Sequence, residues 1–257
     1  PRYYYRIADH QLDGSFRTLP HAADFRNPDG NPDGLFNFKF EFACGNNQNG
    51  NGNSAGPTVP VFDTLNAKVR DEVHFAILNG DWLYEQRRDY PPKSWLHQVG
   101  LDSMKEAPRV VRKAPSIVGV WENYKVFLER GKNLSEWHRH VPSFYTADDH
   151  ELLNDIYGAG ETGYVNRRAV FRDIGTQAWF DYLAWANPLK HDQPAWFGTG
   201  AFEAKSDILE DPEADFTQLD FKQLANLHVH WGTTTAGVPD SKLDAEPGNP
   251  NAAVYEI

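Results

Sequence analysis

Side chains that could bind a metal ion follow three apolar segments of this sequence. Cys44 comes after residues 36–43, Asp81 comes after residues 74–79, and an Asp-Asp-His-Glu sequence occupies 148–151 after a third segment. Thiolates, carboxylates and imidazoles are all metal ligands, and carboxylates suit hard cations. Two carboxylates held at one site repel each other unless a cation lies between them. Because paired metal ions bridged by a carboxylate activate water and bind phosphoryl oxygens, the residue types indicate metal-assisted hydrolysis as the chemistry to test.

Each of these groups also has a purely structural interpretation. Gly80-Asp81 is a common turn sequence, and a single cysteine at the end of a strand is usually a small buried hydrophobic residue. The acidic residues at 148–151 could form a helix N-terminus, where they interact favourably with the helix dipole. The metal site is favoured because all three groups follow consecutive predicted strands.

The segments that precede these side chains have the pattern of an α/β fold. Residues 36–44 alternate four phenylalanines with other residues, which predicts a strand with one buried face. Residues 60–73 have apolar side chains at helical spacing, and residues 74–81 form a short apolar strand. This order predicts a βαβ unit, in which ligands bind beyond the carboxyl ends of the strands. Cys44 and Asp81 should therefore lie at the same edge of the sheet.

The rest of the chain gives weaker signals. Residues 3–18 predict a hairpin that turns at Asp13-Gly14, and residues 88–116, rich in proline and charge, are interpreted as an insertion or a lid. Further elements are expected as helices over 117–137, from residue 133 and over 168–186, and as strands over 140–147, 227–232 and from residue 252. His138 and His140 are expected on a solvated edge, and His228 and His230 on a strand face.

Composition excludes several classes of protein. The chain has 257 residues, of which 40% are hydrophobic, so it can bury a core and is not disordered. Its net charge of −11 argues against a surface that reads nucleic acids. The single cysteine excludes an internal disulfide framework. No apolar run approaches 18 residues, so no transmembrane segment is expected.

Three motifs resemble the alkaline phosphatase D (PhoD-like) group of the metallophosphatases. They are Phe-Ala-Cys-Gly at 42–45, Asn-Gly-Asp-Trp-Leu-Tyr-Glu at 79–85, and Pro-Ser-Phe-Tyr-Thr-Ala-Asp-Asp-His-Glu at 142–151. The resemblance covers roughly residues 1–190. It implies an incomplete α/β/β/α metallophosphatase sandwich preceded by the end of a small β-domain. Residues 1–22 would be the C-terminal hairpin of an N-terminal β-sandwich-like domain, and residues 35–257 the N-terminal part of a truncated catalytic domain.

The resemblance also implies roles for individual residues. Asp81 would bridge two metal ions, and Tyr84 and Cys44 would bind Fe³⁺, which suits their anionic forms. Asp149 stands where most metallophosphatases have an asparagine and would bind the second, hard divalent ion, Ca²⁺ or another. His150 would be the catalytic residue that faces the substrate phosphate, as an electrostatic stabiliser or a proton donor.

The sequence departs from the family in two places. Ala-Cys-Gly at 43–45 replaces the common Ser-Cys-Gln, and two later ligand blocks, an aspartate after a later strand and a Gly-Asp-x-His segment, are not found. His228 and His230 are not interpreted as substitutes. The chain is expected to stop before the missing blocks and to be inactive on its own.

The function implied is that of a metal-dependent phosphoesterase that hydrolyses phosphate mono- or diesters with a metal-activated water. A non-catalytic phosphate- or metal-binding relative and an unrelated α/β binding domain are the alternatives. The family resemblance further implies an exported protein, periplasmic, secreted or on the cell surface, although the first residues show no signal peptide.

Overall fold

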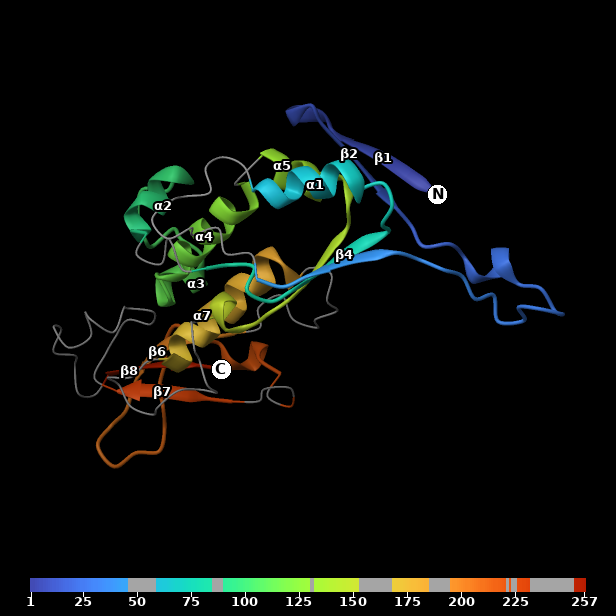
Figure 1. The fold of residues 1–257 in the computed structure, drawn as a ribbon. Helices are drawn as coiled ribbons and strands as arrows, with labels where there is room; N and C mark the ends of the chain where they lie inside the picture. The colour runs from blue at the N-terminus through green and yellow to red at the C-terminus, as the bar shows by residue number, and fades with distance from the viewer. Residues whose placement is uncertain are drawn as a thin grey trace. The chain divides into compact units, whose positions relative to one another are not determined.

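The computed structural model describes residues 1–45, 59–84, 90–129, 132–152, 168–184, 195–220, 222, 226–231 and 252–257. Two compact units make up the chain. The first contains Pro1–Tyr84 and Lys125–Thr146, and the second contains Glu85–Tyr124 and Ala147–Ile257. Figure 1 shows the helices and strands of both units along the chain.

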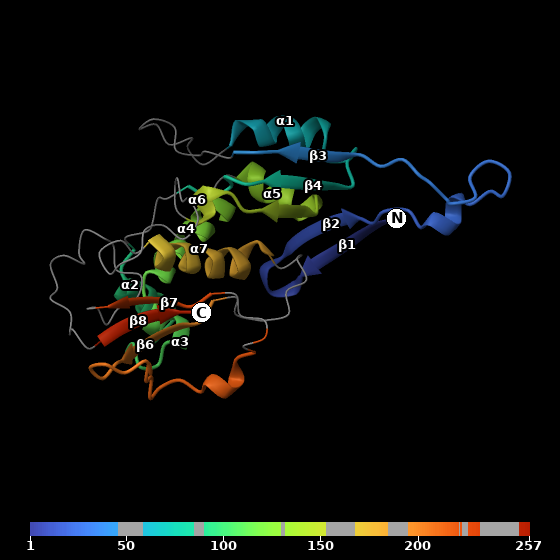
Figure 2. The ribbon, with the colours of Figure 1, turned by 90° about the horizontal axis from the view of Figure 1, so that it is seen from below.

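A parallel sheet forms the centre of the first unit. Its strands are β3 (Phe40–Ala43), β4 (Phe75–Asn79) and β5 (Ser143–Thr146), in the order β3-β4-β5. Helix α1 (Pro60–Lys68) connects β3 to β4, and α5 (Lys132–His140) precedes β5. Figures 1 and 2 show the three strands side by side, with α1 and α5 together on one side of the sheet. The predicted βαβ unit and the α/β fold class are confirmed.

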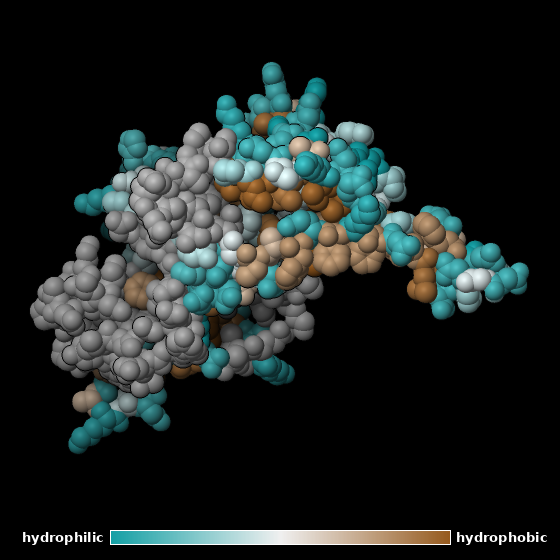
Figure 3. All heavy atoms as spheres, viewed as in Figure 1, coloured by the Kyte–Doolittle hydropathy of each residue, from teal (hydrophilic) through white to brown (hydrophobic). Residues whose placement is uncertain are grey.

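The two faces of this sheet differ in burial. Ala76, Leu78 and Tyr145, on the face toward α5, are buried. On the other face Phe40 is 47% exposed and Phe42 is 60% exposed, and Figure 3 shows hydrophobic side chains gathered along this strand. The prediction that the phenylalanines form a buried face is therefore wrong. Their alternation is real, but it directs them away from the two helices, and Phe40 stacks there on the ring of Phe75.

The N-terminal hairpin forms as predicted, but its turn lies elsewhere. Strands β1 (Arg2–Ile7) and β2 (Leu12–Arg17) pair antiparallel, and the turn is a 3₁₀ segment, Ala8–His10, followed by Gln11 at φ 51°. Asp13 and Gly14 lie within β2 instead. A Cβ atom at position 14 would come within 2.3 Å of the Tyr5 ring, so glycine is required by the close approach of that ring.

The hairpin is attached to α5 through polar contacts. Ser15 Oγ lies 3.0 Å from His140 Nδ1, and His140 Nε2 lies 3.0 Å from Glu136 Oε1. Burial alone would raise the pKa of Glu136, but a hydrogen bond and charge from Arg139, with the charges of His140 and Arg70, lower it overall. His140 is therefore a bridging residue, and its expected place on a solvated edge is wrong.

His138 also differs from that expectation. Its ring contacts the indole of Trp82, with centroids 5.8 Å apart, and its Nδ1 lies 3.3 Å from Tyr145 Oη. Burial lowers the pKa of His138 to about 4, so the side chain is neutral at pH 7. A His-Arg-His run is typical of a solvated edge, but here contacts with the rings of Trp82 and Tyr145 bury the first histidine.

A buried asparagine joins α5 to the start of α1. Asn133 Oδ1 accepts a hydrogen bond from the backbone N–H of Val59 at 3.0 Å, and Asn133 Nδ2 donates to the Val59 carbonyl at 2.6 Å. Asn133 Nδ2 also lies 3.1 Å from Asp63 Oδ1. Both backbone groups of the residue before α1 are thus satisfied by one side chain, which fixes where that helix begins.

The second unit combines helices with an antiparallel sheet. Helices α2 (Pro92–Gln98) and α3 (Arg109–Lys113) lie within the segment interpreted as an insertion or lid. Helix α4 (Ile117–Glu129) confirms the predicted helix there, and the division between the units falls within it. Helices α6 (Asp149–Leu152) and α7 (Arg168–Tyr182) follow, and α7 confirms the prediction over 168–186.

The sheet of the second unit has the order β6-β8-β7. Strand β7 (His228–Trp231) and strand β8 (Ala252–Glu256) were predicted, whereas β6 (Phe197–Ala201) was not. His228 Nδ1 lies 3.0 Å from Asp173 Oδ2 of α7, so this histidine belongs to the contact between β7 and that helix. Among the described residues, no helix is both long enough and apolar enough to cross a membrane. The expected domains, 1–22 and 35–257, stay a prediction.

Candidate metal centre

The candidate site begins at the carboxyl ends of β4 and β5. Asn79 of β4 is paired with Thr146 of β5, and Thr146 Oγ1 donates a hydrogen bond to Asn79 Oδ1 at 2.9 Å. Asp81 follows the end of β4 and Asp149 follows the end of β5, each within three residues. The register of the two strands therefore brings these aspartates to one edge of the sheet, as the sequence predicts.

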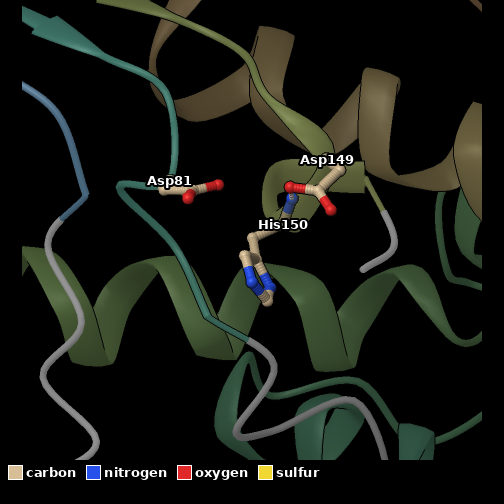
Figure 4. Close-up of side chains that lie close together, drawn as sticks. All are labelled: Asp81, Asp149 and His150. Atoms are coloured by element: carbon tan, nitrogen blue, oxygen red, sulfur yellow. Dashed lines mark hydrogen bonds between the residues drawn. The ribbon is translucent and has the colours of Figure 1, made fainter. Parts of the chain in front are cut away.

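Three side chains meet there. One donor atom each of Asp81, Asp149 and His150 lies within 4.8 Å of the others, and all three residues are partly buried. Figure 4 shows the carboxylates of Asp81 and Asp149 turned toward one another, with the imidazole of His150 to one side of them. The cluster brings together two carboxylates and one imidazole.

The turn that carries Asp81 has an unusual backbone. Gly80 has φ 71° and Asp81 has φ 52°, so two consecutive residues are left-handed. Aspartate is among the side chains that tolerate this region best. The carbonyl of Gly80 accepts a hydrogen bond from the N–H of Gly45 at 3.2 Å, and Tyr84 Oη donates to Asp81 Oδ2 at 3.3 Å. The phenol of Tyr84 is therefore beside the carboxylate that the family resemblance assigns as the bridging ligand.

The residues at 148–151 form a capped helix start. Glu151, which is fully buried, accepts a hydrogen bond from the Asp148 N–H at 2.7 Å, and Asp148 Oδ1 accepts one from the Asp149 N–H at 2.9 Å. The bond to Glu151 is one half of a capping box, in which the side chain three residues into the helix accepts from the N–H of the capping residue. The structural interpretation of this sequence is thus correct as well, because the same turn both caps α6 and presents Asp149 and His150.

Helix α7 packs against the helix α6 that carries this turn. Gly175 lies so close to α6 that a Cβ atom there would come within 2.6 Å of Leu152 Cα and 2.9 Å of the Glu151 carbonyl oxygen. From the sequence, Glu151 is recognised only as one of the acidic residues of a possible helix N-terminus, and Gly175 is not recognised at all. The Asp-x-x-Glu spacing at 148–151 was an available signal for the cap, but nothing local marks the glycine.

Cys44 occupies a different position from the other predicted ligands. It directly follows β3, is exposed, and precedes the glycine that is hydrogen-bonded to Gly80. Its sulfur is not among the donor atoms that lie within 4.8 Å of one another. The structure thus places Cys44 at the same edge of the sheet but outside the cluster. Its alternative interpretation as a small buried hydrophobic residue is wrong.

The donor set fits a bound cation. Two carboxylates that face each other are mutually repulsive, and a cation between them removes that repulsion. Carboxylate oxygens and a phenol oxygen suit hard ions. The described residues therefore offer ligands of the right chemistry for at least one ion.

Comparison with known proteins agrees with this chemistry. The PhoD-like phosphatase family matches residues 39–229. A solved structure described as "Structure of PhoD" is 19% identical, with a TM-score of 0.41, and the match covers 67% of this chain and 28% of that chain. The present chain thus spans about a quarter of the length of that protein. No curated protein gives a significant match. By the family match, the chain belongs to the PhoD-like phosphatases.

Proposed function

We propose that the protein is a metal-dependent phosphoesterase that hydrolyses phosphate esters with a metal-activated water. The observation that carries this proposal is the meeting of Asp81, Asp149 and His150 within 4.8 Å beyond two parallel strands. Membership of the PhoD-like phosphatase family supports the reaction class. The proposal includes both phosphate monoesters and diesters as substrates.

The proposed assignment of ligands follows the family resemblance, and the cluster supports it for Asp81 and Asp149 but not for Cys44, which lies outside it. Asp81 would bridge two ions, Tyr84 and Cys44 would bind Fe³⁺, and Asp149 would bind Ca²⁺ or another hard divalent ion. The hydrogen bond from Tyr84 to Asp81 supports placing the phenol at the bridged pair. When bound, the ions would lower the pKa of a water molecule and neutralise charge on the phosphate.

His150 would act on the substrate. It follows Asp149 directly, and its backbone N–H donates to Asp149 Oδ1 at 3.0 Å. The imidazole is therefore held beside the ligands by its own backbone, where it would donate a hydrogen bond to the phosphate of a bound substrate. Such a donor stabilises the charge that develops as the ester bond breaks. An exported location is part of the same proposal.

The proposal is tested in the full-length protein by Asp81→Asn, with Asp24→Asn, an exposed aspartate, as the matched control. Metal content and hydrolysis of a nitrophenyl phosphate are measured on both variants and the wild type. We expect Asp81→Asn to lose both ions and essentially all activity, because a shared ligand serves two sites. Two ions retained at wild-type stoichiometry would contradict the assignment. A wild type that binds metal but hydrolyses no ester would indicate the non-catalytic alternative.

The identity of the first ion is tested by its colour. Phenolate or thiolate ligands on Fe³⁺ give a charge-transfer band in the visible spectrum, so Tyr84→Phe should shift or bleach that band. A colourless protein that contains one equivalent of iron would exclude the Fe³⁺ assignment. An unchanged spectrum of Tyr84→Phe would exclude Tyr84 as the ligand.

A further inference from the structure

Trp82 is the buried neighbour of the candidate ligand Asp81. It directly follows that residue in the chain and is only 3% exposed. Its indole contacts three rings: Phe62 at 6.3 Å and 90°, His138 at 5.8 Å and 77°, and Tyr145 at 5.6 Å and 65°, as centroid distances and interplanar angles. These partners come from α1, α5 and β5 respectively. Edge-to-face contacts of this kind are a favoured geometry for aromatic rings.

The three contacts fix the backbone where the site turn ends. Gly80 and Asp81 both have positive φ, a conformation that persists in a non-glycine residue only where the surroundings determine it. The hydrogen bond between Gly45 and Gly80 constrains the start of the turn. The end of the turn is constrained by Trp82, whose large side chain packs against two helices and the neighbouring strand. His138 stays neutral at pH 7, because burial lowers its pKa to about 4, so it packs there as an uncharged ring.

We propose that Trp82 is a positioning residue that sets the place of the Asp81 carboxylate through the backbone. This inference rests on the proposed function, since it concerns the metal ligand assigned there. The indole would not touch the ion or the substrate. Its packing would instead hold the Gly80-Asp81 turn in the conformation that points the carboxylate out of the sheet edge.

The test compares Trp82→Leu with Trp137→Leu in the full-length protein. Trp137 is also a buried tryptophan, and it also contacts Phe62, at 6.0 Å, but it belongs to α5 and not to the site turn. Both variants lose a large ring from the same core, so both should lower the midpoint of thermal unfolding. Mn²⁺ affinity is then measured by electron paramagnetic resonance, with Mn²⁺ as the only metal, at a temperature where each variant is fully folded.

We expect Trp82→Leu to weaken Mn²⁺ binding by about tenfold or more, the lower end of the range for residues that orient metal ligands. Trp137→Leu should bind within about twofold of wild type. Trp82→Phe, which keeps a smaller ring, should weaken binding by about threefold and is the variant to use if Trp82→Leu does not fold. Wild-type affinity in whichever Trp82 variant folds would overturn the proposal, as would equal losses in the two leucine variants.

The failure of this inference is distinguishable from failure of the proposed function. If wild-type protein binds no Mn²⁺, the proposed metal site is wrong, and the positioning role falls with it. If wild type binds Mn²⁺ and Asp81→Asn abolishes binding while Trp82→Leu does not, the metal site stands and only the role of Trp82 is refuted.

Discussion

For His150, an effect on metal binding can be distinguished from an effect on the reaction. It lies in the first turn of α6, a partly buried neighbour of Asp149. We predict that His150→Ala keeps the bound metals but lowers the turnover number by about 10²–10³, the effect of removing one donor to the transition state. Steady-state hydrolysis of a nitrophenyl phosphate, together with metal analysis, measures both effects.

The exposed histidine His97 provides the control for this variant. His97→Ala should leave turnover unchanged. Unchanged turnover in His150→Ala would exclude a role at the substrate, whereas a variant that fails to fold would show that the histidine serves the structure.

His138 makes stability depend on pH. Its folded-state pKa is about 4, lowered by burial from 6.5, so the unfolded chain binds more protons between these values. Its neutral form is the stable one in the fold, and stability should fall as the pH drops below about 6.5. From pH 7 to pH 5 the loss would be up to about 2 kcal/mol from this residue. Urea denaturation of wild type and His138→Gln at both pH values measures it.

The variant removes the titrating group, so its free energy of unfolding should change less between pH 7 and pH 5. His10→Gln, at an exposed histidine, should retain the wild-type pH dependence. If wild type and His138→Gln lose equal stability on acidification, His138 is not the group responsible.

At the scale of elements, the contact between α6 and α7 controls where two site residues lie. A Cβ atom on Gly175 would collide with the backbone of Glu151 and Leu152, which cannot move as a flexible side chain can. We predict that Gly175→Ala displaces α6 and weakens Mn²⁺ binding by about tenfold, as expected when the residues supporting a ligand are disturbed. Isothermal titration with Mn²⁺ measures the affinity.

Gly30→Ala is the matched control, because no atom lies within 4 Å of the Cβ position at that glycine. It should bind Mn²⁺ as wild type does. Undiminished binding in Gly175→Ala would show that the turn carrying Asp149 tolerates the shift.

The elements predicted correctly are those whose signal is local. Three predicted elements each show a repeat of apolar residues that is visible within a few turns of helix or a few residues of strand. They are the helix at 60–73, the strand at 74–81 and the aromatic helix at 168–186. The predicted position of the hairpin turn is wrong because the Asp13-Gly14 pair is also compatible with a strand. Here Gly14 lies inside β2, where the Tyr5 ring leaves no room for a Cβ atom. Strand β6 was missed because its two glycines resemble loop sequence.

The candidate site could be predicted in part for a topological reason. Parallel neighbouring strands end at one edge, so Asp81 and Asp149 had to approach each other once the strand order was right. Trp82 and Gly175 could not be identified this way, since their roles arise from packing between elements distant in sequence. Cys44 shows what strand order alone does not predict. Strand order places this residue at the edge of the sheet, but it does not determine whether the sulfur comes within bonding distance of the other candidate ligands.

At the scale of the whole molecule, the exposed phenylalanines of the parallel sheet are the feature most relevant to solution behaviour. Phe38, Phe40, Phe42 and Phe144 are each at least 44% exposed, and the rings of Phe38, Phe40 and Phe144 all contact the ring of Phe75. Contiguous apolar surface of this kind favours association and aggregation. We predict that Phe42→Ser lowers binding of a hydrophobic dye and the light scattering of concentrated samples.

Val61→Ser is the control, because Val61 is 55% exposed but lies on α1 and not on the phenylalanine face. It should change neither measurement. Because Phe42 is so exposed, its replacement should alter the free energy of unfolding by less than about 1 kcal/mol. Equal dye binding in wild type and Phe42→Ser would show that this face does not drive association.

The double hydrogen bond between Asn133 and Val59 has a consequence for how the protein can be modified. It fixes the chain at the entry to α1, just as the bond from Gly45 to Gly80 fixes it after β3. Gly45 and Val59 are therefore two fixed points of the chain. An affinity tag or fluorescent reporter should not replace Gly45, Val59 or Asn133, because removing either set of hydrogen bonds would release the backbone at one of these points.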